Sequence, residues 1–136
     1  MAQQVNSKKV APLHYKEYLN RSEELLNASQ YSFENQNWDA CALNAVHAAI
    51  SASDALTTYK LGERSAGQSH DEAVRLFKQT DFQDKETQSN AVRLSSILKE
   101  KNASAYEEKP VKPRTAEILL IESRRLLEFV KIKVPV

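Results

Sequence analysis

The sequence has few glycines, a single cysteine and no long apolar run. Two glycines in 136 residues are few for an all-β protein, which uses glycine in turns and bulges, so a helical fold is favoured. The one cysteine, Cys41, excludes an internal disulfide, and we expect it to be a small core residue. No apolar stretch approaches the roughly 18 residues that a bilayer requires, so we expect no transmembrane helix.

A strong net charge is also missing. The formal net charge is +1 at pH 7, so no overall field draws the protein to nucleic acid or to a membrane. The first ten residues, MAQQVNSKKV, lack the apolar centre of a signal peptide. We therefore expect a cytoplasmic protein whose residues 1–11 form a loose tail.

Common catalytic and cofactor motifs are absent from the sequence. It contains no glycine-rich phosphate loop, no paired cysteines and no HExxH. The three histidines, His14, His47 and His70, are widely separated and match no metal-ligand spacing. A lone histidine on a helix is more often structural than a ligand, because a metal site needs several converging ligands. We expect neither a metal nor a cofactor.

Five segments with helical periodicity make up most of the chain. Their apolar residues recur every three or four positions, and short polar or proline-containing turns separate them, so neighbouring helices should be antiparallel. The expected helices are Pro12 to about Gln30, Asn37 to Gly62, Ser69 to about Gln79, Asp84 to about Ala105, and Pro113 to about Ile132. Four are long and one is short. This inventory predicts an all-α, up-and-down helical bundle that forms one domain over residues 12–134.

The second segment is the longest uninterrupted helix. Alanine, the best helix former, recurs through it and lets neighbouring helices come close, so we expect this helix to be central. Asn37 suits the N-cap, and Gly62 suits the left-handed residue that ends a helix. After it, Ser69 and Glu72 have the spacing of a capping box that opens the short third helix.

A row of polar residues follows one face of this central helix. Its members are three or four residues apart and therefore share a face: Asn44, His47, Ser51, Asp54 and Thr58. The simpler interpretation is a solvated surface. The alternative is a polar groove or a subunit contact, in which His47 and Asp54 belong to a buried hydrogen-bonded network.

The order of motifs resembles that of HEPN-domain proteins. The family's helix with alanine at every third position is similar to AVHAAISASDAL, and the segment after its glycine-containing loop is similar to SHDEAVRLF. The family's last two helices are similar to SSILKEKNASAYEEKPVKPRTAEILLIESRRLLEFVK. The resemblance extends over roughly Tyr15 to Val134. It implies a small helical bundle, usually a dimer, and in many members a metal-independent endoribonuclease.

The resemblance also implies where a catalytic motif would lie. In active members an arginine holds the phosphate and a histidine four to six residues away handles protons, and two such motifs face each other across the dimer. By position the motif falls on Lys101–Tyr106, where Asn102 keeps the polar second residue. Lysine lacks the bidentate fork of arginine, and tyrosine, with a reference pKa of about 10, is a poor base at neutral pH. The resemblance thus predicts a degenerate catalytic site.

A second pair, Arg64 and His70, satisfies the motif's spacing literally. It precedes the short third helix, where the family's catalytic motif does not lie. His70 is also explained as a first-turn residue of a capped helix. The pair remains an alternative catalytic site.

Three functions are compatible with these observations. The first is a non-catalytic HEPN-like protein that forms homodimers and binds a nucleotidyltransferase-like partner protein, RNA or a nucleotide. The second is a metal-independent endoribonuclease, the toxin of a toxin–antitoxin pair, that uses Arg64 and His70. The third is a helical adaptor with no nucleic-acid role.

Overall fold

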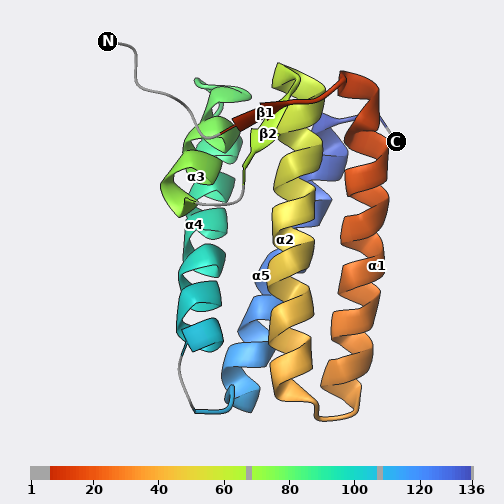
Figure 1. The fold of residues 1–136 in the computed structure, drawn as a ribbon, viewed down its shortest axis with the longest axis vertical. Helices are drawn as coiled ribbons and strands as arrows, with labels where there is room; N and C mark the ends of the chain where they lie inside the picture. The colour runs from red at the N-terminus through yellow and green to blue at the C-terminus, as the bar shows by residue number, and fades with distance from the viewer. Residues whose placement is uncertain (1–6, 67–68, 107–108, 136) are drawn as a thin grey trace.

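The computed structural model describes residues 7–66, 69–106 and 109–135, with the side chains of residues 101–106 excepted. Within these ranges, five α-helices stand side by side as an up-and-down bundle (Figure 1). They are α1 (Tyr15–Glu34), α2 (Trp38–Leu61), α3 (His70–Gln79), α4 (Lys85–Tyr106) and α5 (Pro113–Lys133). Only α3 is short, so the predicted all-α bundle of four long helices and one short helix is confirmed.

Helix α2 lies in the middle of the bundle and packs against α1, α4 and α5 (Figure 1). Two buried serines of α1 donate hydrogen bonds to its backbone. Ser22 Oγ donates to the Ala48 carbonyl at 2.7 Å, and Ser29 Oγ donates to the Cys41 carbonyl at 2.8 Å. Small side chains on both helices allow this approach, and the hydroxyls of Ser22 and Ser29 each keep a hydrogen bond although they are buried. Cys41 is fully buried, as expected of a core residue.

The predicted ends of α2 are nearly those observed. Gly62 has φ +67° and its amide donates to the Thr58 carbonyl at 3.0 Å, so the left-handed C-terminal residue is confirmed. Asn37 precedes the first helical residue, but its side chain makes no capping hydrogen bond. The helix therefore starts where expected without the side-chain cap that the sequence predicted.

The other helix ends differ more from expectation. Helix α1 follows a 3₁₀ turn, η1 (Pro12–His14), and continues to Glu34 rather than ending near Gln30. Ser69 Oγ accepts a hydrogen bond from the Glu72 amide at 3.5 Å, so half of the capping box is present. The Glu72 carboxylate bonds Arg75 at 2.7 Å instead of closing the box.

A small two-stranded ribbon crosses the end of α2 (Figure 1). Strand β1 (Ser7–Lys9) pairs antiparallel with β2 (Glu63–Ser65), and Lys8 lies opposite Arg64. Residues 7–9 therefore form a strand instead of the loose tail predicted for residues 1–11, and residues 1–6 lie outside the described residues. Polar segments of three residues show no alternation of apolar and polar positions, and main-chain hydrogen bonds decide their pairing.

Contacts between the two ends of the chain complete the bundle. The Tyr15 hydroxyl donates to the Pro135 carbonyl at 2.9 Å, and α1 packs along α5. These contacts support one domain over residues 12–134, which we retain as a proposal. No helix in the described ranges is both long and apolar enough to cross a membrane.

Candidate functional site

A pocket of about 190 Å³ lies between α2, β2, the start of α3 and α4. Polar side chains come from the first three elements: His47, Ser53, Asp54, Arg64, Ser65, Ser69 and His70. Apolar side chains form the rest of the lining: Ile50, Ala73, Leu94 and Leu98. A concave, largely apolar surface with a few converging polar groups is typical of a small-molecule site.

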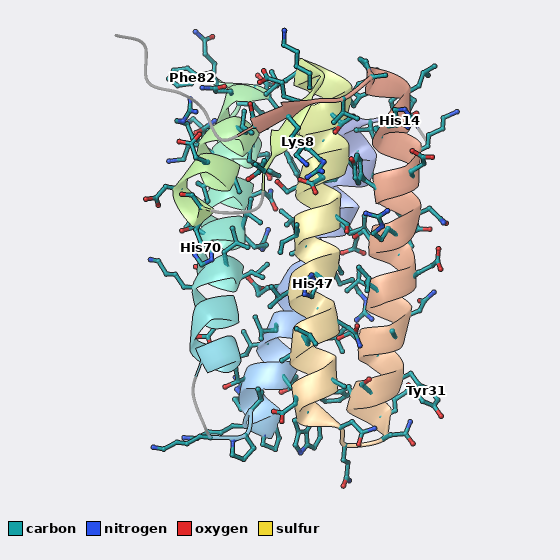
Figure 2. The ribbon with its side chains drawn as sticks, in the orientation of Figure 1. Lys8, His14, Tyr31, His47, His70 and Phe82 are labelled. Atoms are coloured by element: carbon teal, nitrogen blue, oxygen red, sulfur yellow. The ribbon has the colours of Figure 1, made fainter. Side chains whose placement is uncertain are left out.

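The local structure explains how these residues meet. His47, Ile50 and Asp54 are three or four residues apart on α2, so they share one face of the helix. Gly62 ends α2, and β2 then brings Arg64 back beside that face. Figure 2 shows His47 on α2 and His70 near the start of α3, on the two sides of the pocket. Residues distant in sequence thus converge because the chain reverses direction at Gly62.

The Arg64 guanidinium has a defined position in the pocket wall. Its Nη1 donates to the Ser65 carbonyl at 3.0 Å, and Arg64 itself is partly buried. A guanidinium carries five N–H donors, so further donors remain for a ligand. Arg64 is therefore the fixed positive charge of the pocket.

Asp54 is the unusual titratable group of the pocket. Burial raises its pKa from 3.8 to about 7, because a charged carboxylate loses solvation there. The positive charges of Arg64 and Arg21 lower the pKa but do not offset the burial. At neutral pH the Asp54 side chain is therefore divided between the carboxylic acid and the carboxylate.

The predicted polar row on α2 is neither fully solvated nor a buried network. The side chain of His47 is exposed. His47 therefore does not belong to a buried network with Asp54, as one interpretation of the sequence predicted. Asp54 and Asn44 are partly buried, and Ser51 is buried at 6% exposure. Asn44 and Ser51 do not line the pocket, whereas His47 and Asp54 do. The groove interpretation thus applies to half of the proposed binding residues.

The two candidate catalytic pairs are placed differently. Arg64 and His70 both line the pocket, so the structure brings this pair together. Lys101, Asn102 and Tyr106 fall in the last turns of α4, and their side chains lie outside the described residues. The degenerate motif therefore stays a prediction from the sequence.

Several pocket residues were missed by sequence reasoning. Leu94 and Leu98, four residues apart on the apolar face of α4, are buried and line the pocket. Ser65 was part of a loop, and Ser69 was considered only as a cap. Helical spacing identifies a buried face but does not show whether that face lines a cavity. No sequence signal therefore distinguishes a packed core residue from a pocket residue.

Other parts of the described structure offer weaker sites. A depression between α1 and α5 contains an ion pair of Lys131 with Glu23, and Arg124 donates to Gln30 at 2.9 Å. These groups already bind one another. In the described ranges, no cluster of three or more His, Cys, Asp or Glu residues is arranged to hold a metal ion.

Comparison with models of protein families finds a match to the HEPN domain over residues 15–133. The matched segment begins with the first residue of α1 and ends with the last residue of α5. It therefore includes every pocket residue. No curated protein and no solved structure shows significant similarity to the chain.

Proposed function

The chain belongs to the HEPN-domain family, and on this premise we propose that it is a non-catalytic member that acts by binding. The ligand is RNA or a nucleotide, whose phosphate lies against Arg64 in the α2–β2–α3 pocket. The protein works as a homodimer and with a nucleotidyltransferase-like partner protein. One observation carries the proposal: Arg64, His47 and His70 line the same pocket.

The chemistry of the pocket favours a phosphate-bearing ligand. Arginine binds phosphate through parallel N–H donors, and two imidazole rings add further N–H donors. The start of α3 contributes the positive end of a helix dipole. The apolar residues Leu94 and Leu98 provide a surface for the uncharged part of the ligand.

The non-catalytic part of the proposal rests on the sequence. Lys101 and Tyr106 occupy the positions of the family's catalytic arginine and histidine. A lysine attracts phosphate as a point charge, but a tyrosine is mostly protonated at neutral pH and removes protons poorly. The protein then retains a phosphate-binding surface without efficient acid–base chemistry.

A binding measurement with a matched control tests the proposal. Fluorescence anisotropy with a labelled short RNA and competition with nucleotides would be measured for the wild type, Arg64→Met and Arg114→Met. Arg114 is 79% exposed and pairs with Glu117, away from the pocket. We expect Arg64→Met to weaken binding about tenfold or more, because hydrogen bonds to charged groups contribute about 1.5–3 kcal/mol. Arg114→Met should change little.

Salt dependence separates this function from that of a plain adaptor. Phosphate contacts release counterions, so RNA binding should weaken steeply as salt rises. An absence of RNA and nucleotide binding at low salt would favour the adaptor. Equal weakening by both arginine variants would mean that general surface charge, not the pocket, binds the ligand.

A metal-independent endoribonuclease is the second candidate. It is favoured by two imidazoles beside a guanidinium in one pocket, the groups needed to move protons and hold a phosphodiester. Purified protein would be incubated with labelled RNA in EDTA. Cleavage that His70→Ala abolishes supports this candidate, as does growth arrest relieved by the same change on induction in a bacterial host. Cleavage lost in Lys101→Ala or Tyr106→Phe would instead assign activity to the degenerate motif.

Assembly is tested separately from ligand binding. Sedimentation of the purified chain at several concentrations reports the homodimer directly. Purification of the native chain from its own cells shows which protein co-purifies with it. Recovery of a nucleotidyltransferase-like protein in a fixed ratio supports the paired complex, and a monomer in both measurements contradicts this part of the proposal.

A further inference from the structure

We propose that the pocket binds the anionic group of a small phosphate ester against Arg64, and that Asp54 takes up a proton when this anion enters. The inference rests on the proposed function, because it concerns the same pocket. The inference adds how protonation controls ligand binding in this pocket. Ligand binding becomes coupled to pH through a single carboxyl group.

The position of Asp54 creates the coupling. It lines a pocket of about 190 Å³ together with Arg64, so an anion placed against the guanidinium lies close to the Asp54 carboxyl. Two negative charges in a partly buried space repel each other strongly, because the surroundings screen them less than water does. A protonated carboxyl is neutral, and its O–H can donate a hydrogen bond to a phosphate oxygen.

The proton is readily available at neutral pH. Burial has already raised the pKa of Asp54 to about 7. An approaching anion raises it further, since a nearby like charge disfavours the ionised carboxyl. The carboxyl is therefore more fully protonated in the complex than before the anion enters.

The charged and titratable groups near Asp54 and its pocket come from several elements. Arg21 of α1 and Arg64 of β2 act on its pKa as positive charges. Lys8 of β1 lies opposite Arg64 in the strand register. His47 of α2 and His70 of α3 line the pocket, and α4 contributes only the uncharged Leu94 and Leu98 to its lining. Protonation of Asp54 thus leaves a lining of neutral and cationic groups, which suits an anion.

A cationic ligand would give the opposite pH dependence. It would bind the ionised Asp54 carboxylate and would bind more tightly as pH rises through 7. The guanidinium of Arg64 opposes such a ligand at every pH. The sign of the pH dependence therefore identifies the charge of the ligand that the pocket accepts.

Isothermal titration calorimetry with methyl phenyl phosphate tests the inference. This phosphodiester keeps a single negative charge from pH 5 to pH 9, so the ligand does not titrate, and its phenyl ring matches the apolar lining. We expect binding to be about tenfold weaker at pH 8 than at pH 6, as follows for a carboxyl of pKa near 7 that must be protonated. Titrations at pH 7 in buffers of different ionisation enthalpy should show net proton uptake.

The variant series assigns that proton. Asp54→Asn mimics the protonated carboxyl and should bind at pH 8 about as tightly as the wild type binds at pH 6. Its proton uptake at pH 7 should fall by about half a proton, the share of an acid at its pKa. Asp71→Asn removes an exposed carboxylate beside His70 that does not line the pocket, and it should behave as the wild type.

The histidines need their own control because His47 and His70 also line the pocket and an imidazole can also bind a proton. The double variant His47→Gln/His70→Gln should keep most of the loss of affinity between pH 6 and pH 8. If this variant loses the pH dependence while Asp54→Asn keeps it, the proton belongs to the histidines and the inference is overturned.

The wild-type measurement alone also shows whether ligand binding is coupled to proton uptake, even if Asp54→Asn fails to fold. Equal affinity at pH 6 and pH 8 without proton uptake overturns the coupling but leaves the binding function intact. Failure of methyl phenyl phosphate to bind at any pH overturns the anion pocket. The proposed function survives that result only if RNA or nucleotide binding still depends on Arg64.

Discussion

The Nζ atom of Lys133 lies 2.9 Å from Oδ2 of Asp84, so the last turn of α5 is tied to the residue that precedes α4. The same carboxylate accepts hydrogen bonds from the Thr87 amide at 3.0 Å and from the Thr87 hydroxyl at 2.8 Å. Asp84 therefore caps the N-terminus of α4, at the residue where the sequence predicts this helix to begin. Lys133 first, and Thr87 second, hold the pKa of Asp84 at about 2.

This contact predicts a loss of stability in acid. The pKa of Asp84 is lower in the folded chain than its ordinary value of 3.8, so the folded state favours the ionised carboxylate. The stabilisation is complete above pH 4 and disappears as pH falls toward 2. Asp84→Asn should therefore lower the melting temperature at pH 7 and have a much smaller effect at pH 2. Thermal melts followed by circular dichroism measure both, with Asp71→Asn as the surface control. A melting difference that is independent of pH would contradict the assignment.

Asp54 should make stability depend on pH in the opposite direction. Its folded pKa of about 7 exceeds the unfolded value near 3.8, so the folded state binds more protons between these values. The free energy of unfolding should fall as pH rises from 4 to 7 and change no further through Asp54 above that range. A three-unit shift sets a ceiling of about 4 kcal/mol, and partial exposure of the side chain makes the real effect smaller.

The measurement for Asp54 is urea unfolding at pH 4.5 and pH 8. Asp54→Asn should be more stable than the wild type at pH 8 and nearly equal to it at pH 4.5. The opposite result, a variant that is less stable at pH 8, would show that the ionised carboxylate makes stabilising contacts.

Phe77 should anchor α3 and hence one wall of the pocket. Its ring is fully buried and its centroid lies 6.2 Å from that of Phe129 on α5. Phe77→Ala should lower the free energy of unfolding by about 3–5 kcal/mol, as large-to-small core changes of this type do. Phe82, which is 76% exposed in the α3–α4 turn, provides the matched control. If Phe77→Ala and Phe82→Ala have equal effects on urea unfolding, α3 does not pack as described.

Substitution of Gly62 should destabilise the protein because of the backbone conformation at this position, and not because a side chain would lack room. A Cβ there would meet the Val10 carbonyl oxygen at 3.6 Å, an ordinary contact distance, but φ is +67°. Gly62→Ala should therefore cost about 1–2 kcal/mol from the left-handed conformation alone. Gly62→Asn should cost less, because asparagine adopts this conformation more readily. Equal costs in thermal melts would point to crowding instead.

The helices were predictable because their signals are local. The spacing of apolar residues marks α1 to α5, and Gly62 and Asp84 mark ends whose partners lie within four residues. The predicted bundle and the family followed from these patterns. The β1–β2 ribbon was not predictable, because Lys8 and Arg64 are brought together by tertiary structure and neither segment has a pattern of its own.

The site was predictable only in part. The row on α2 included His47 and Asp54, and the motif spacing gave Arg64 and His70; all four residues line the pocket. The pKa of Asp54 depends on burial, which no local pattern specifies. The same limit applies to Leu94, whose helical spacing marks a buried face, since a cavity exists only when several helices have assembled.

The pairing of β1 with β2 joins residues on either side of the α1–α2 hairpin. A proteolytic cut in the turn at residues 35–37 would therefore leave two fragments still held together by the strand pairing and by the seam between the helices. The strand that carries Arg64 would keep its neighbour. Nicked protein should thus co-elute as a single species and separate only in denaturant.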